Sequence, residues 1–143
     1  MPDKVSEYVL QQLRTAAMSA LENAYAPYSL YPVAAALLTT QGKIVQGCNI
    51  ENAAYPSGLC AEASAIAQLV SSSGYQRIRA VYVLCAADEP AWPCGSCRQR
   101  LNEFADPELE VYAATQNGIL QRADFIDLFP HSFGPANLRG GEK

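Results

Sequence analysis

Residues 78–104, IRAVYVLCAADEPAWPCGSCRQRLNEF, carry the clearest signal of the fold class. The run 78–87 is mostly apolar and β-branched, which is typical of a strand covered on both faces. Residues 95–104 follow with a helical pattern. Before the strand, residues 59–70 are rich in Ala with Glu, Gln and Leu, a helix-forming composition that ends at 71–74. Helices and strands therefore alternate, which indicates an α/β fold.

The flanking segments extend this pattern. Apolar residues at three- and four-residue steps predict an amphipathic helix over 4–24. Residues 31–40 and 43–49, joined by Gln41-Gly42, predict an antiparallel hairpin. The remaining predicted elements are a strand over 108–115, a short strand over 118–121 and a helical turn over 123–128. We therefore expect a three-layer α/β/α fold with a mixed sheet of about five strands.

Length and composition limit the architecture. The chain has 143 residues, of which 50% are hydrophobic and 17% charged, so we expect residues 1–143 to form a single domain. All apolar runs are much shorter than the roughly 20 residues that a membrane span needs. Residues 1–7 do not resemble a secretory signal. We therefore expect a soluble, cytoplasmic protein without a membrane partner.

Three of the five cysteines stand where helices are expected to begin. Cys60 follows Ser57-Gly58, and Cys94 and Cys97 follow Pro93. An odd number of cysteines favours metal binding or catalysis over a set of disulfides. Helix N-termini favour the thiolate, which is the form that binds zinc. The i, i+3 spacing of Cys94 and Cys97 brings both sulfurs to one side of a helical turn.

Three thiolates leave a tetrahedral zinc with one open position, which is typical of catalytic sites. His131 could close the site, but a lone histidine in a Pro- and Gly-rich tail is more often solvated or packed. Glu62 lies two residues after Cys60, and alone it would be interpreted as a first-turn glutamate favoured by the helix dipole. Beside these cysteines it becomes a candidate proton carrier for a water on the metal.

The motifs CAE at residues 60–62 and PCGSCRQ at residues 93–99 resemble the paired signature of the zinc-dependent cytidine deaminases, in their small three-cysteine form. AYAPYS at 24–29 and GCNIENAAY at 47–55 are similar to further segments of this family, so the resemblance covers nearly the whole chain. It implies hydrolytic deamination of free cytidine and 2′-deoxycytidine in pyrimidine salvage, with release of ammonia. It also implies one zinc per protomer on the three cysteines, with Glu62 as the catalytic residue.

The same resemblance implies a set of substrate-binding residues. Asn49 and Glu51 would bind the sugar hydroxyls, although without the metal motif they would be interpreted as polar residues that end a strand. Tyr31 stands where the family has an aromatic ring against the pyrimidine, more often Phe, although a strand aromatic is usually a core residue. The Ala61 N–H would contact the base carbonyl, and the Trp92 carbonyl would receive the exocyclic amine.

The expected partners follow from charge and from the resemblance. A net charge of −4 argues against nucleic acid, because such binding relies on clustered Lys and Arg. The resemblance instead implies a small-molecule nucleoside substrate. Phe133 resembles a C-terminal aromatic residue that reaches a neighbouring subunit's site in tetrameric members of the family. We therefore expect a homotetramer with shared active sites.

One position departs from the family pattern. Ala63 stands where most three-cysteine members have an arginine that donates to the cysteine sulfurs and offsets their charge. Three thiolates and one zinc sum to a charge of about −1, so other donors must compensate. Arg98, directly after Cys97, is the nearest cation in sequence and is expected to fold back toward the sulfurs, unless it is an exposed helix residue.

Three alternatives stay open at this point. Related deaminases of a nucleoside antibiotic also lack the arginine at the position of Ala63, so a modified cytosine nucleoside remains a possible substrate. A zinc-stabilised interaction module without catalysis would explain the cysteines but gives Glu62 no role. A thiol redox protein would use Cys94 and Cys97, but leaves Cys60 unexplained.

Overall fold

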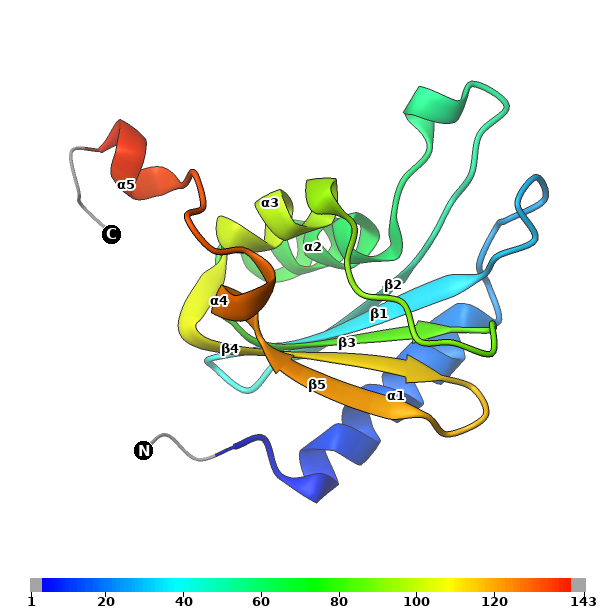
Figure 1. Ribbon diagram of the computed structural model, residues 1–143, viewed down its shortest axis with the longest axis horizontal. Helices are drawn as coiled ribbons and strands as arrows, with labels where there is room; N and C mark the ends of the chain where they lie inside the picture. The colour runs from blue at the N-terminus through cyan, green and yellow to red at the C-terminus, as the bar shows by residue number, and fades with distance from the viewer. Residues whose placement is uncertain (1–3, 140–143) are drawn as a thin grey trace.

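The computed structural model describes residues 4–139, which form a five-stranded mixed sheet with helices on both faces (Figure 1). The strand order is β2-β1-β3-β4-β5. The strands are β1 (Val33–Thr39), β2 (Ile44–Cys48), β3 (Ile78–Cys85), β4 (Ala105–Thr115) and β5 (Leu120–Asp124). Only β3 and β4 pair in parallel; the other neighbouring strands are antiparallel. The predicted three-layer α/β/α fold is confirmed.

Helices cover the two faces of the sheet unequally. The helices are α1 (Glu7–Leu21), α2 (Ala61–Ser73), α3 (Gly95–Asn102), α4 (Phe125–Leu128) and α5 (Pro135–Leu138), with a 3-10 turn at Tyr55–Ser57. Helix α1 begins after Ser6, whose hydroxyl accepts the Val9 N–H at 3.2 Å. Within residues 4–139, α1 is the helix that covers one face, and α2, α3 and α4 lie on the other (Figure 1). None of these helices is long and apolar enough to cross a membrane.

Strand β1 contributes to the core on both faces, because its side chains alternate. Ala34 and Ala36 pack toward α1, and Ala35 and Leu37 pack toward α2. The small alanine side chains let the helices approach the sheet closely. Strand β3, at the centre of the sheet, is buried at almost every position, as its apolar composition predicts.

A glycine in β2 lets α2 approach the sheet. A Cβ atom at Gly47 would meet the backbone of Ala65 and would lie 2.8 Å from the hydroxyl oxygen of Ser64. Such contacts are too short for any side chain, so the helix that carries Cys60 and Glu62 lies directly on the strand at this point. Gly47 therefore fixes the height of the α2 N-terminus above the sheet.

We predict that Gly47→Ala lowers the free energy of unfolding by about 1–3 kcal/mol, because α2 must move away from β2. Urea unfolding of the metal-free protein measures this change. Gly95→Ala is the matched control, since a Cβ at Gly95 has open space around it and its φ is not positive. Equal stability of Gly47→Ala and the wild type would show that α2 has freedom to shift.

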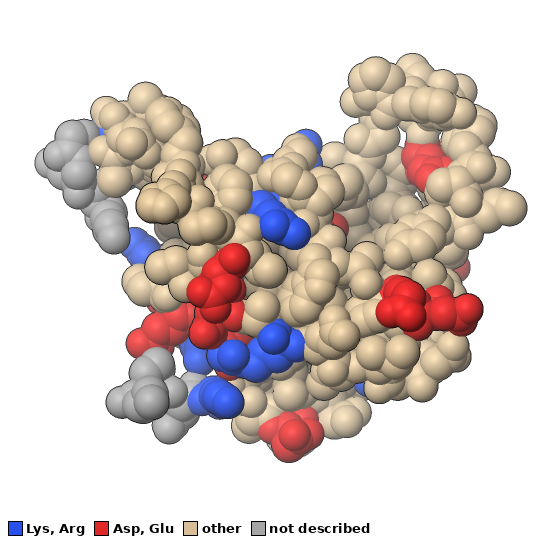
Figure 2. Space-filling view, in the orientation of Figure 1, with Lys and Arg blue, Asp and Glu red and all other residues tan. Residues whose placement is uncertain are grey.

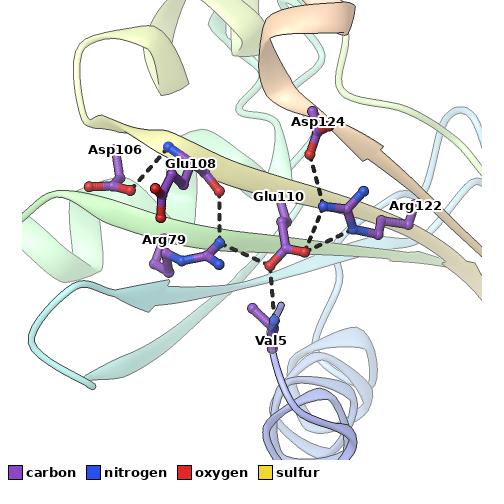
Figure 3. Close-up of polar contacts among 7 residues, drawn as sticks. All are labelled: Val5, Arg79, Asp106, Glu108, Glu110, Arg122 and Asp124. Atoms are coloured by element: carbon purple, nitrogen blue, oxygen red, sulfur yellow. Dashed lines mark hydrogen bonds and ion pairs between the residues drawn. The ribbon is translucent and has the colours of Figure 1, made fainter. Parts of the chain in front are cut away.

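A buried carboxylate ties the start of the chain to the sheet (Figure 3). Glu110 in β4 is 1% exposed, and its carboxylate accepts the Val5 N–H at 3.0 Å. It also pairs with Arg79 of β3 at 2.9 Å and with Arg122 of β5 at 2.7 Å. Glu110 shares its face of the sheet with Tyr112, so this cluster lies on the α1 side, opposite α2 and α3. The hydrogen bond and ion pairs of Glu110 therefore contribute to the stability of the fold.

Candidate active site

The N-termini of α2 and α3 bring three sulfur atoms together. Cys60 is the residue before α2, Cys94 is the residue before α3, and Cys97 lies in the first turn of α3. Their Sγ atoms all lie within 4.8 Å of one another, and those of Cys60 and Cys94 are 3.9 Å apart. Cys97 is buried and Cys94 is exposed. The cluster is thus open to a ligand on one side.

The sulfur positions fit a tetrahedral zinc ion. Two sulfurs that each lie about 2.3 Å from such an ion are about 3.8 Å apart, close to the 3.9 Å between the Sγ atoms of Cys60 and Cys94. Within residues 4–139, the cluster contains these three cysteines and no histidine or carboxylate, so His131 is not part of it. The donor set therefore leaves a fourth position for a non-protein ligand.

The three cysteines of the cluster differ in how their surroundings shift the pKa of the thiol. Burial raises the pKa of Cys97, and the nearby charges of Glu62 and the other two sulfurs raise it further. The pKa of Cys60 is also raised, first by burial and then by Cys94. The pKa of Cys94 is lowered: burial opposes this, but the Cys97 N–H and the neighbouring sulfurs outweigh it. The backbone at the start of α3 therefore favours the thiolate of Cys94, and a bound metal ion would favour the thiolate at all three cysteines.

Glu62 lies in the first turn of α2 and is only 4% exposed. Burial raises the pKa of its carboxyl group, and its own backbone N–H, the charge of Arg100 and a bond with Cys97 partly oppose this. A buried carboxyl with a raised pKa beside a metal cluster is suited to accept a proton and return it.

The structure does not support the predicted role of Arg98. Its Nε donates to the Pro93 carbonyl at 2.8 Å, and its Nη1 donates to the Leu128 carbonyl at 2.8 Å. Arg98 therefore joins the loop before Cys94 to α4 instead of turning toward the sulfurs. Arg100, whose Nη1 lies 3.7 Å from the Cys97 sulfur, was not predicted from the sequence. Its i+3 spacing from Cys97 was the available signal.

A cavity of about 510 Å³ opens beside Cys60. Its walls come from the loops around residues 28–29 and 49–59, and include Tyr28, Asn49, Glu51, Tyr55 and Leu59. Figure 2 shows the loop that carries the 3-10 turn and the C-terminal α5 as two projections with a depression between them, and the cavity beside Cys60 is lined from the first of these and not from α5. A larger cavity, of about 680 Å³, lies between α5 and the end of α3, so it is at the wrong end of that helix for the cysteines.

Asn49 and Glu51 hold the loop before β1. The Asn49 side chain accepts the Val33 N–H at 3.0 Å and donates to the Tyr31 carbonyl at 2.9 Å, which leaves its second amide hydrogen for a ligand. Glu51 accepts the Tyr28 N–H at 2.9 Å, the Ser29 N–H at 3.1 Å and the Ser29 hydroxyl. The Ser29 hydroxyl is the main cause that lowers the pKa of Glu51, so its carboxylate is an ionised acceptor.

Comparison with known proteins identifies the family. Residues 8–113 match the family model described as the cytidine and deoxycytidylate deaminase zinc-binding region. The chain belongs to this family. The cytidine deaminase of Sporosarcina psychrophila is 38% identical over 129 residues, which cover 90% of this chain and 94% of that protein. The crystal structure of cytidine deaminase from Burkholderia pseudomallei has a TM-score of 0.80 at 38% identity and covers 90% of this chain and 100% of that one.

The cytidine deaminase from Mycobacterium tuberculosis is also similar in structure, with a TM-score of 0.76 at 35% identity over 91% of this chain and 99% of that one. The resemblance to the cytidine deaminase family, on which the sequence interpretation rested, is therefore confirmed. The matched family model describes a zinc-binding region, and in this chain the cluster of three cysteines lies within the matched residues.

Four further predicted residues of this deaminase-family chain do not line the cavity. Tyr31 is 39% exposed, and its pKa is raised first by desolvation and then by a hydrogen bond with Cys85. Ala61 is buried and Trp92 is partly buried, and both pack in the α2 side of the core. Phe133 is 58% exposed, while its carbonyl accepts from Gln99 and Asn102 at 2.8 and 3.1 Å. These two hydrogen bonds hold the backbone at Phe133, whose exposed ring does not line the cavity beside Cys60.

Several residues that line the cavity were not predicted from the sequence, among them Tyr28, Ser29, Tyr55 and Leu59. Tyr28 and Tyr55 pack edge to face with ring centroids 6.0 Å apart, which joins the two loops across the cavity wall. Both tyrosines belong to the segments that resemble the family, at 24–29 and 47–55. The sequence therefore pointed to these segments but did not predict that the two tyrosines line the cavity.

Proposed function

We propose that this chain catalyses the hydrolytic deamination of cytidine and 2′-deoxycytidine to uridine and 2′-deoxyuridine, with release of ammonia. The observation that carries the proposal is the buried carboxyl of Glu62 beside the three-sulfur cluster, whose Cys60 lines the same cavity as Asn49 and Glu51. The relatives that are named cytidine deaminase match nearly the full chain and support the same reaction. Such an activity belongs to pyrimidine salvage.

Cys60, Cys94 and Cys97 would hold one zinc per protomer, and zinc bound in this way supplies a Lewis acid that makes water nucleophilic at neutral pH. Glu62 takes a proton from the attacking water and delivers it to N3 of the cytosine ring as the C4–O bond forms. Glu62 then carries the remaining proton of the new C4 hydroxyl to the amino group, and the C4–N bond breaks as the C4 carbonyl forms, so that the amino group leaves as ammonia. Burial of Glu62 keeps its proton from exchanging freely with solvent.

The pocket residues give the substrate its orientation. Asn49 donates to a sugar hydroxyl and the Glu51 carboxylate accepts from one, so both favour a free nucleoside over cytosine base. The Ala61 N–H binds the base carbonyl, the Trp92 carbonyl receives the exocyclic amine, and Tyr31 lies against the ring. These two sugar contacts also favour cytidine over an antibiotic nucleoside with a different sugar.

A homotetramer with shared active sites completes the proposal. Phe133 would reach the site of a neighbouring subunit, and its exposed ring on a fixed backbone is consistent with this. Tyr55 at 76% and Leu138 at 80% exposure are further large apolar side chains that an interface would cover.

Metal analysis combined with an ultraviolet assay of cytidine conversion tests the proposed function. We expect one zinc per chain and uridine as the product. Zinc binding without conversion of any cytosine nucleoside would instead favour a non-catalytic zinc module. Conversion of a modified cytosine nucleoside but not of cytidine would favour the antibiotic-type alternative.

We predict that Glu51→Ala lowers kcat/KM for cytidine on the order of tenfold or more, because a charged acceptor for the 3′-hydroxyl is lost. The loss should be smaller for 3′-deoxycytidine, which lacks that hydroxyl. Steady-state kinetics on both substrates measure the difference. Ser29→Ala is the matched control: it removes a partner of the Glu51 carboxylate but keeps the carboxylate itself, so both substrates should be affected equally. Equal losses in Glu51→Ala would reject the sugar contact.

A further inference from the structure

The proposed zinc site has an excess of negative charge. Three thiolates and one Zn²⁺ sum to a charge of about −1, and the Glu62 carboxylate adds to it when ionised. Cys97 and Glu62 are both buried, so water does little to screen them. A buried and uncompensated charge is costly, and here it would weaken the hold of the thiolates on the metal. The protein needs a positive group near these sulfurs.

Three residues near the cysteines differ in whether they bring a positive charge to the sulfurs. Ala63, directly after Glu62, is buried and offers only a methyl group. Arg98 uses its guanidinium on the carbonyls of Pro93 and Leu128. Arg100, in the last turn of α3, extends back toward the start of the helix, as helical side chains do, and its Nη1 lies 3.7 Å from the Cys97 sulfur. This distance is within hydrogen-bonding range of the large sulfur atom.

We propose that Arg100 is a positioning residue of the metal cluster: it donates to the Cys97 sulfur and offsets the charge of the three thiolates. The inference rests on the proposed zinc site. A guanidinium suits this role because it stays charged at all ordinary pH values and directs its N–H groups along fixed lines. The simpler explanation of Arg100 is a basic residue that complements the dipole at the α3 C-terminus. That explanation does not require the side chain to reach the first-turn sulfur.

The test compares Arg100→Gln and Arg100→Lys with the wild type, all loaded with zinc. Transfer of zinc to a chelator measures metal retention. We expect Arg100→Gln to lose about 10–100-fold in zinc affinity, as is usual when a group behind the metal ligands is removed. Arg100→Lys should fall between, because it keeps the charge without the directed donor. Lys4→Gln is the matched control for net charge, since Lys4 precedes α1 on the opposite face of the sheet.

Cobalt substitution gives a second readout that a purely structural role would not move. Loss of a hydrogen bond makes the Cys97 thiolate more electron-rich, so the sulfur-to-cobalt charge-transfer band of Arg100→Gln should shift to longer wavelength. Circular dichroism checks that each variant is folded. Should Arg100→Gln fail to fold, Arg100→Lys decides, and its zinc retention must then lie below that of the wild type.

The outcomes separate this inference from the proposed function. Wild-type zinc retention and an unshifted cobalt band in the Arg100 variants would overturn the role of Arg100 while the zinc site stands. Failure of the wild type itself to bind zinc would reject the proposed site. A loss of zinc in Lys4→Gln equal to that in Arg100→Gln would show an effect of net charge alone, and would also overturn the inference.

Discussion

Glu62→Gln should lose nearly all turnover of cytidine while zinc and nucleoside still bind. The amide has almost the volume of the carboxyl group, so the buried position beside the sulfurs is filled as before. It cannot accept a proton and return it, however, and general acid–base catalysis contributes about 10²–10⁴-fold to a reaction rate. Single-turnover kinetics, zinc content and nucleoside affinity measured on the same preparation give the three quantities.

The control for this prediction is Glu7→Gln. Glu7 is also a glutamate in the first turn of a helix, but it lies in α1 on the other face of the sheet. If Glu62 served only to complement the helix dipole, both variants would lose less than about 1 kcal/mol of stability and neither would lose turnover. Near-normal turnover in a zinc-loaded Glu62→Gln protein would remove Glu62 from the reaction.

The sequence predicted the central part of the fold well because burial there follows local composition. Strand β3, the hairpin of β1 and β2, and helix α2 were each expected within a few residues of their observed bounds. The edge of the sheet was less predictable. Residues 118–121 were expected as a short strand, but β5 is Leu120–Asp124, because pairing with β4 extends it to the Glu110↔Asp124 pair. The helical turn expected from residue 123 therefore begins only at Phe125.

In the candidate site, the positions of residues were easier to predict from the sequence than the directions of their side chains. The position of the three cysteines and Glu62 at the starts of α2 and α3 was predictable, since their spacing and helix-start positions are local properties. Arg98 was proposed because it is the nearest cation to Cys97 in sequence, and Arg100 was not considered. One of the two acceptors of Arg98, the Leu128 carbonyl, is 30 residues away and is placed by α4. A side chain's direction on a helix depends on such distant acceptors, which no local pattern reveals.

Glu110 is a second residue whose importance only the structure reveals. We expect Glu110→Gln to lower the free energy of unfolding at neutral pH by about 3–5 kcal/mol, because it removes the common partner of two guanidinium groups. Arg79 and Arg122 would then face each other without the carboxylate between them (Figure 3). Urea unfolding monitored by circular dichroism measures the change.

The pH dependence of this loss identifies its cause. Burial acts to raise the pKa of Glu110, but the Val5 N–H, Arg122 and Arg79 outweigh it, so the pKa is lowered. A carboxyl group whose pKa is lower in the folded state stabilises the fold above its unfolded pKa, about 4.3, and loses that contribution as the pH falls through the folded value. The difference in stability between the wild type and Glu110→Gln should therefore be full near pH 7 and shrink in acid.

Asp124→Asn supplies the matched control for this pH series. Asp124 pairs with the same Arg122 at 2.8 Å, but its side chain is 53% exposed, so the substitution should cost no more than about 1 kcal/mol. Similar losses in Asp124→Asn and Glu110→Gln would mean that burial adds nothing to the ion pairs of this cluster. A Glu110→Gln loss that stays constant from pH 7 into acid would show that it arises from packing and not from the carboxylate charge.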